Sequence, residues 1–449
     1  MSNALQSTVS SRRILQLALP IILGGIAQNV ILATDVIFMS RVDEVSLDAV
    51  GIAGLFFSTV YIIGLGFSTG VQIIIARRHG EKQHKAIGNL FDNSLLFLLL
   101  TSFVLWLGME VLGPPILKSL ISSEAVYQSA VIYLDQRAWG ITFAMVNLAF
   151  RAFFIGVSSS AIITWSTIGI AVSNGLLNYG LIFGNWAMPQ LGIAGAAIAS
   201  SLSEIVGLCI FLAYTFGKRL KREFSLFESW KWDWPAMRLI LNTATPVMFQ
   251  YFISHAGWFL FFIVIEHNGE RALAISVLIR MIYMFQMVPF WGFSAATNTL
   301  VSFVIGEGRS DQVMPVLKKI TVYALVSCLP LVALNLIAPE WVLGLAVDPM
   351  HAELVQDAIP TLYVISSALI FFALAMTWFS GVSGSGNTRT ALWIETGAIL
   401  VYLIMAYILG MIVEADVHII WLTEPFYFLV MGLVSYMYIR SGRWKGKQI

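Results

Sequence analysis

Charged residues are scarce in this chain. Asp, Glu, Lys and Arg make up 11% of its 449 residues, against about 25% in ordinary soluble domains. Apolar residues make up 58%, and the mean hydropathy is +0.82. This composition excludes a typical soluble protein and predicts an all-α polytopic membrane protein in contact with the lipid bilayer. The net charge of +1 says little about partners, and we expect no nucleic-acid partner.

Cysteine is nearly absent as well. Cys209 and Cys328 both lie in apolar segments without a metal-binding or redox spacing, so we interpret them as packing residues. The sequence contains no metal-ligand cluster, nucleophile elbow or paired acid and base, which argues against an enzyme. The glycine-rich run 381–386 lacks the lysine of a phosphate-binding loop, so we do not expect it to bind ATP. No cofactor is expected other than a bound proton or Na⁺.

Long apolar runs are what the sequence has in abundance. A bilayer-spanning helix needs about 20 apolar residues, and the first run is retained because no A-x-A-type cleavage site follows it. The chain contains twelve such spans, at about 14–39, 49–76, 89–112, 127–155, 161–184, 192–216, 239–266, 272–305, 317–338, 356–380, 390–413 and 416–439. The polar segment 217–238 divides them into an N-terminal lobe (1–216) and a C-terminal lobe (239–449) of six helices each.

The basic residues predict the orientation of these spans. If both termini lie inside, the inner segments hold most of the 26 Lys and Arg residues, including a cluster in the cytoplasmic linker 217–238. The outer loops then hold only Arg41, Lys118 and Arg271. Because inner loops carry an excess of Lys and Arg, we expect a multi-pass protein of the inner (plasma) membrane with both termini in the cytoplasm.

The two halves of the chain are internally repeated. Pro20 and Pro246 are separated by the same offset as Phe67-Ser68 and Phe293-Ser294, and as Gly80-Glu81 and Gly306-Glu307. Six spans per half make the repeats parallel, so we expect two pseudo-symmetric lobes. Two such lobes are typical of transporters that work by alternating access, with the substrate cleft between them.

One ionisable residue stands out in the first span. Asp35 lies in the run 17–39, which is otherwise almost entirely apolar. A carboxylate in hydrocarbon is costly, so it is expected to face a cavity, a partner or an ion. Two interpretations remain open: a structural hydrogen bond to a neighbouring helix, or a proton or cation site.

Three other polar residues are predicted to reach the depth of Asp35. Asp35 lies about 6 Å and Asn178 about 8 Å from the outer ends of their helices, at 1.5 Å per residue. Asn174 is one turn deeper than Asn178 on the same face. Ser200 lies about 12 Å from the outer end of its own helix. Oxygen ligands of this kind suit Na⁺, and the carboxylate can equally carry a proton, so the coupling ion stays open.

At this point the sequence resembles the MATE family, the multidrug and toxic compound extrusion transporters. The resemblance covers nearly the whole chain, and its most specific parts are ATDVIFMSRV, FSTGVQIIIARRHGE, FRAFFIGVSSS, NGLLNYGLIFG, FSAATNTLVSFVIGEG and FSGVSGSGNTRTA. The family implies twelve helices in two lobes and ion-coupled export, with entering protons or sodium driving organic cations out. It also implies a monomer.

The resemblance assigns roles to several N-terminal positions. Asp35 matches the coupling carboxylate of the first span, Asn174 and Asn178 match paired polar positions of the fifth, and Ser200 matches a hydroxyl position of the sixth. Some members carry an aspartate where this chain has Asn178, which weakens a two-carboxylate site. Gln28 matches a cavity-lining glutamine, although an interhelical hydrogen bond is an equal alternative.

The C-terminal lobe departs from the sodium-type pattern, because the two carboxylates expected in its first and fourth spans are missing. In the first of these spans, Gln250 and His255 are the polar residues instead, and both are candidates for the substrate path. Glu204 and Glu424 hold similar places in the two repeats and are secondary acidic candidates, with structural pairing as the alternative.

Two prolines are candidate hinges. Pro20 and Pro246 interrupt equivalent helices, and each removes one helical hydrogen bond and permits a bend. We expect bending of the first span to be coupled to protonation of Asp35 or ion binding by it.

The sequence therefore predicts a proton- or sodium-coupled antiporter that exports amphipathic organic cations, such as drugs. The alternative is a flippase for lipid-linked precursors, which needs basic residues in its cavity, and Arg280 is the one good candidate in the second half. A channel is possible in principle.

Overall fold

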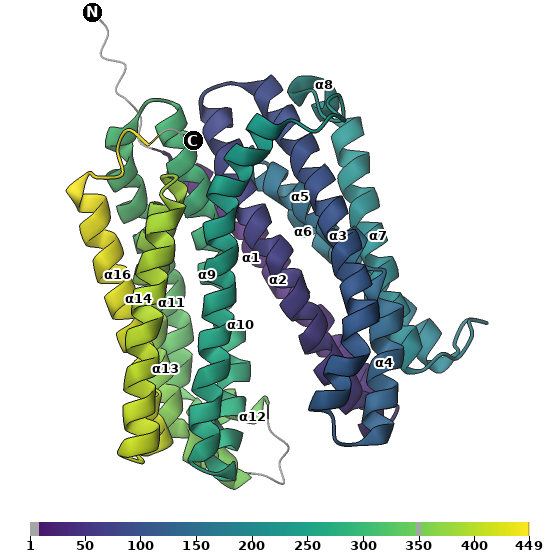
Figure 1. Cartoon of the computed structure of the whole chain (residues 1–449). Coiled ribbons are helices and arrows are strands. Elements are labelled where there is room, and N and C mark those ends of the chain that lie inside the picture. The colour runs from purple at the N-terminus through teal and green to yellow at the C-terminus, as the bar shows by residue number, and fades with distance from the viewer. Residues whose placement is uncertain (1–8, 347–351, 448) are drawn as a thin grey trace, which may run out of the picture. The chain divides into compact units, whose positions relative to one another are not determined.

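The long apolar runs of the sequence form long helices in the computed structural model, which describes residues 9–346, 352–447 and 449 (Figure 1). The first half of the chain contains α1 (Ser11–Met39), α2 (Glu44–Gly80), α3 (His84–Leu120), α4 (Glu124–Ala138), α5 (Ile141–Gly156), α6 (Ala161–Phe183), α7 (Ile193–Gly217) and the short α8 (Leu220–Phe224). The second half contains α9 (Trp234–His267), α10 (Glu270–Gly306), η1 (Ser310–Gln312), α11 (Val313–Ile337), α12 (Pro339–Gly344), α13 (Ala352–Gly384), α14 (Thr388–Tyr407), the π-helical turn η3 (Ile408–Ile412), α15 (Val417–Ile420) and α16 (Thr423–Ser441).

The predicted fold class is confirmed. Eleven helical segments of the described chain are long and apolar enough to cross a membrane, and the pair α4 and α5 makes a twelfth if it counts as one span. These two helices are bent by 50° at a break where the sequence predicts one continuous span, 127–155. A Cβ atom on Gly140, which precedes α5, would lie 2.3 Å from the Ser201 hydroxyl and 2.6 Å from Arg137 Nη1. A larger residue at this break would have to displace the side chains of Ser201 and Arg137.

Apolar side chains cover much of the accessible surface of these helices. On α3, Leu100, Val104, Leu107 and Val111 are all exposed and recur at helical spacing along one face. A contiguous apolar stripe of this kind is rare on a soluble monomer. It is the surface that a helix presents to lipid tails.

Two compact units divide the chain, and the divisions fall beside the two repeat-related prolines. One unit is Leu23–Ala244, and the other is Thr245–Ile449 together with the chain up to Ile22. Pro20 lies inside α1 and Pro246 inside α9. The helices α1 and α9 thus each begin in one unit and end in the other, whereas the sequence placed the divisions in the linker 217–238.

The polar linker is held on α3 by side chains that bond its backbone. Asp92 accepts hydrogen bonds from the N–H groups of Phe227 (2.7 Å) and Ser229 (2.8 Å). Asn93 accepts one from the N–H of Asp233 (2.9 Å), whose carboxylate in turn accepts from Ala236 N–H in the first turn of α9. Buried backbone groups of the linker are satisfied in this way without a strand or a long helix.

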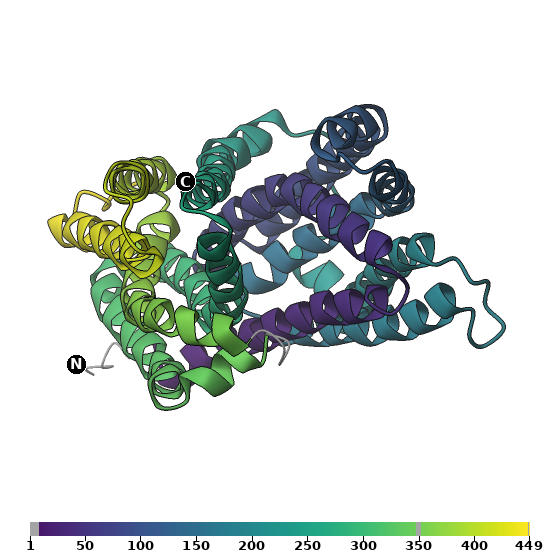
Figure 2. The same ribbon diagram turned by 90° about the horizontal axis from the view of Figure 1, so that it is seen from below.

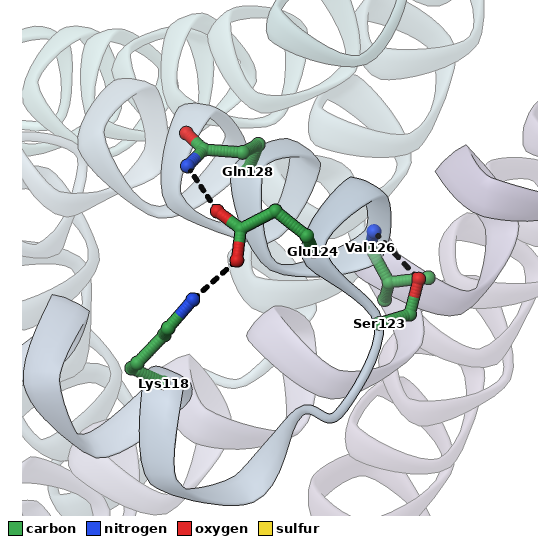
Figure 3. Close-up of polar contacts among 5 residues, drawn as sticks. All are labelled: Lys118, Ser123, Glu124, Val126 and Gln128. Carbon is green, nitrogen blue, oxygen red and sulfur yellow. Dashed lines mark hydrogen bonds and ion pairs between the residues drawn. The ribbon is translucent and has the colours of Figure 1, made fainter.

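The turn between α3 and α4 is fixed by polar contacts (Figure 3). Glu124, the first residue of α4, pairs with Lys118 and accepts a hydrogen bond of 2.7 Å from Gln128 Nε2. Ser123 caps α4 by accepting from Val126 N–H at 3.5 Å. A carboxylate at a helix N-terminus is favoured by the helix dipole, so these contacts stabilise the N-terminus of α4.

The helices α6 and α7 form a closely packed hairpin, and the loop 184–192 that joins them extends from its end (Figures 1 and 2). α6 ends at Gly184, which adopts the left-handed conformation (φ 74°) that closes a helix. A Cβ atom on Gly195 would lie 2.5 Å from the carbonyl oxygen of Leu181. The close approach of α6 and α7 therefore depends on the missing side chain of Gly195.

This packing makes a testable prediction about Gly195→Ala. The added methyl group meets backbone, which cannot move aside as a flexible side chain can, so the α6–α7 hairpin must open. We expect overpacking of this kind to cost about 1–3 kcal/mol, seen as a lower melting temperature of the purified protein in detergent. The matched control is Gly175→Ala on α6, where a Cβ atom has no neighbour within 4 Å. Equal melting temperatures for the two variants would contradict this account.

Candidate functional site

The site is formed by three helices of the unit Leu23–Ala244, and α1 supplies its carboxylate. The second part of α1 runs alongside α6 in the same direction. Gly24 lies against Thr167, and Phe38 packs edge-on against Phe183 with ring centroids 5.9 Å apart. Asp35 of α1 therefore faces the outer half of α6.

A continuous chain of hydrogen bonds joins the four residues predicted for the coupling site. Asn178 Nδ2 donates to Asp35 Oδ1 at 2.6 Å and to Asn174 Oδ1 at 3.1 Å. Asn174 Nδ2 donates to Ser200 Oγ at 3.2 Å. The side chains come from α1, α6 and α7, so the structure brings all four together, whereas their role in coupling stays a prediction.

Burial is uneven along this chain of side chains. Asn174 and Asn178 are almost completely buried, whereas Asp35 is partly exposed. Both hydrogens of the Asn178 amide are used, but its Oδ1 atom is buried without a hydrogen-bond partner. A buried oxygen without a donor is costly, so Asn178 Oδ1 is free to accept a hydrogen bond or to contact a cation beside Asp35.

A basic side chain missed as a site residue lies near this carboxylate. Arg137, in the last turn of α4, is buried, and its charge acts on Asp35. Its guanidinium lies 4.1 Å from the centre of the Phe57 ring and donates to Ser201 Oγ at 3.3 Å. The signal in the sequence was a charged residue inside an apolar span, followed by the glycine at which that span breaks. Arg137 therefore adds a positive charge to the surroundings of Asp35 without forming an ion pair with it among the described residues, while its own contacts are with Ser201 and Phe57.

The chemistry of the site is that of hard oxygen atoms. The Asp35 carboxylate, the two amide oxygens and the Ser200 hydroxyl can carry a proton or surround a small cation. No group of three or more His, Cys, Asp or Glu residues that could hold a metal ion occurs among the described residues. Carboxylate, amide and hydroxyl oxygens are hard ligands, which in general suit hard cations better than soft transition metals.

The remaining predicted residues do not join this cluster. Gln28 lies two turns before Asp35 on α1 and is exposed. Gln250 is buried, and its amide donates to the carbonyl of Thr388 at 3.0 Å, which attaches α9 to the start of α14. His255 is exposed, with Nδ1 2.8 Å from the carbonyl of Tyr251. The role of these three residues in a substrate path stays a prediction.

The secondary acids and the flippase candidate also lie outside this cluster. Glu204 accepts a hydrogen bond of 2.7 Å from Asn147 of the neighbouring helix α5. Glu424 is buried in the other unit of the chain. The Arg280 guanidinium lies 5.2 Å from the centre of the Phe262 ring on α9, where it stacks against an aromatic face.

Solved structures match this fold over almost the whole chain. One is described as the outward-facing conformation of a multidrug resistance MATE family transporter of the MOP superfamily. It has a TM-score of 0.88, 20% identity and coverage of 96% of this chain and 95% of that chain. Another, from Pyrococcus furiosus, is described as a MOP superfamily transporter whose binding pocket has reversed polarity. It has a TM-score of 0.89, the same identity and the same coverage. These matches show that the fold is shared.

Sequence comparison finds relatives named as probable multidrug resistance proteins NorM. The one from Rhizobium meliloti is 30% identical over 241 residues, so the match spans 53% of this chain and 50% of that protein. The one from Thermotoga maritima is 23% identical over 445 residues, which cover 98% of this chain and 94% of that protein. The MatE family model matches residues 20–180 and 246–408, a doublet that reproduces the internal repeat. This chain belongs to the MatE family, a family of membrane transporters rather than enzymes.

Proposed function

We propose that the chain is a multidrug exporter that works as a secondary antiporter, exchanging an inward-moving proton or Na⁺ for an amphipathic organic cation by alternating access. The observation that carries the proposal is the hydrogen-bonded chain from Asp35 through Asn178 and Asn174 to Ser200. It places one ionisable group and three neutral oxygen groups among apolar helices. The names of the relatives, multidrug resistance proteins, support drugs as the class of substrate.

The amide of Asn178 gives the proposed site two hydrogen-bonding states. When Asp35 is ionised, it accepts from Asn178 Nδ2, as the structure has it. A protonated Asp35 can donate a hydrogen bond, and Asn178 Oδ1, which has no partner in the structure, can accept it. Rotating the Asn178 amide by 180° would exchange these two hydrogen-bonding arrangements. A bound Na⁺ would use the same oxygen together with the carboxylate.

The surroundings proposed for this transporter follow from its charge pattern and its helices. We place it in the inner (plasma) membrane with both termini and the linker 217–238 in the cytoplasm, because the basic residues concentrate on that side. Each chain contains two repeated units, so a monomer is sufficient for the proposed cycle. The partners are the bilayer, the organic cation and the coupling ion.

Asp35→Asn tests the proposed coupling site. Coupling free energies of about 1–3 kcal/mol correspond to roughly 5–150-fold changes, so export of a fluorescent organic cation from cells is expected to fall at least about fivefold. The proton and sodium gradients are varied separately, and wild-type export depends on whichever ion is coupled. Asp135→Asn, which changes an exposed carboxylate on α4, is the matched control. Normal export by Asp35→Asn would assign Asp35 a purely structural role.

Pro20→Ala tests the proposed hinge in α1. The boundary between the compact units falls two residues after this proline, inside α1, which continues to Asp35. Restoring the missing helical hydrogen bond with Pro20→Ala is expected to stiffen α1 and reduce export, with little change in protein level. Pro330→Ala in α11 is the control for removal of a helical proline elsewhere. If Pro20→Ala transports fully with unchanged ion dependence, bending of α1 is not part of the cycle.

A further inference from the structure

A basic cavity lies in the unit Leu23–Ala244 where α7 ends and α8 begins, and Figure 1 shows α8 next to the end of α7. The cavity has a volume of about 590 Å³ and is lined by Phe216, Arg219, Lys221, Arg222 and Glu228. Phe216 lies about 24 Å along α7 from Ser200, at 1.5 Å per residue. The basic cavity is therefore separate from the proposed coupling site.

The three basic side chains of this cavity are not neutralised within the protein. None of them takes part in an ion pair among the described residues, and neither does Glu228, the acid that lines the same cavity. Arg219 and Arg222 are exposed, and the Lys221 ammonium lies 5.9 Å from the centre of the Phe216 ring. Because a hollow lined mainly by one sign of charge concentrates its electric field, this cavity attracts anions.

The helix α8, which carries Lys221 and Arg222, is held firmly in its unit. The buried ring of Phe224 stacks on His84, with ring centroids 5.0 Å apart, and meets Phe153 edge-on at 5.4 Å. A Cβ atom on Gly88 of α3 would clash with the carbonyl oxygens of Phe224 and Ser225. This close approach fixes α8, so its basic side chains start from a rigid backbone, which lowers the entropy cost of binding an anion.

The segment that carries Glu228 is fixed as well. The backbone N–H groups on either side of it, those of Phe227 and Ser229, both donate to the carboxylate of Asp92 on α3. The Phe227 ring also stacks on Phe216, with centroids 5.9 Å apart and planes 16° from parallel. The cavity is thus formed by three anchored pieces of backbone: the end of α7, the helix α8 and the segment around Glu228.

The surroundings of the cavity favour a lipid headgroup over a soluble anion. The helix α7 is long and apolar enough to cross a membrane, and the cavity lies at its end. Large aromatic side chains are exposed here, namely Phe216, Trp230, Trp232 and Trp234. Exposed tryptophans are typical of the level of the lipid headgroups, and basic residues beside the end of a span attract anionic lipids. The volume is within the roughly 300–1,000 Å³ of ordinary ligand pockets, so a headgroup fits.

We propose that this cavity binds the headgroup phosphate of an anionic phospholipid, with Arg219, Lys221 and Arg222 as its charge partners and the acyl chains in the bilayer beside Phe216. An arginine can bind a phosphate through two parallel N–H groups, whereas a lysine acts as a point charge. Glu228 repels the phosphate and so limits the affinity. The proposal goes beyond the exchange of an ion for an organic cation and does not depend on it.

The test is native mass spectrometry of the full chain in detergent, titrated with dioleoyl phosphatidylglycerol, which counts bound lipid and gives an apparent Kd. A basic residue near an anionic headgroup contributes about fivefold to binding, so the double variant Arg219→Gln, Arg222→Gln should bind this lipid roughly 25-fold more weakly. Glu228→Gln should bind it more tightly, because a repelling charge is gone. The matched control is the double variant Lys218→Gln, Lys231→Gln, which removes the same charge from exposed residues outside the cavity and should weaken binding far less.

Further controls separate these effects from misfolding and from other anions. Misfolding does not tighten binding, so Glu228→Gln tests the site even if the arginine double variant does not fold. Dioleoyl phosphatidylcholine has the same acyl chains and no net charge, and its binding should not respond to these substitutions. Equal weakening by the two double variants would overturn the proposal, since the attraction would then be diffuse. Displacement of the lipid by an equal concentration of inorganic phosphate would also overturn it, because the site would then take a soluble anion. The readout measures no transport, so failure of the proposed antiport leaves it intact.

Discussion

The absence of water in the bilayer core governs this structure. Each polar side chain placed among apolar helices must find a partner within the protein or remain costly. Polar side chains of the described residues accordingly form bonded sets, among them the chain from Asp35 to Ser200, the Asn147–Glu204 pair, and the set of Ser254, Glu395 and Tyr427. Where a set leaves a buried oxygen without a partner, as at Asn178 Oδ1, that oxygen can accept a hydrogen bond when a neighbouring group gains a proton.

Close packing of helices makes those sets possible. The missing side chain of Gly195 lets α7 approach the backbone of α6, and this places Ser200 within reach of Asn174. Small residues at helix contacts are typical of membrane proteins, since lipid gives helices little hydrophobic reason to associate. The same logic applies at Gly140, where the break between α4 and α5 accommodates the Arg137 side chain. The geometry of the site thus depends on glycines that carry no chemistry themselves.

Much of this arrangement is predictable from sequence, and the limits are physical. Length and hydropathy predict the spans, and the rise of a helix predicts that Asp35, Asn178 and Asn174 lie at similar depth. Depth along a helix does not say which neighbour a side chain faces. For that reason the contact between Gln250 and Thr388 and the stacking of Arg137 on Phe57 were not predicted. The division of α1 and α9 between the two units also depends on contacts between helices that are far apart in sequence, which the sequence pattern does not reveal.

The central claim is that Asp35 binds the ion whose movement drives export. The most direct test uses reconstituted vesicles with an imposed gradient of organic cation and no ion gradient, and measures proton and sodium movement across the membrane. We expect wild-type protein to move one of these ions opposite to the substrate, and Asp35→Asn to move neither while still binding substrate. Substrate-driven ion movement of the wild-type size through Asp35→Asn would contradict it.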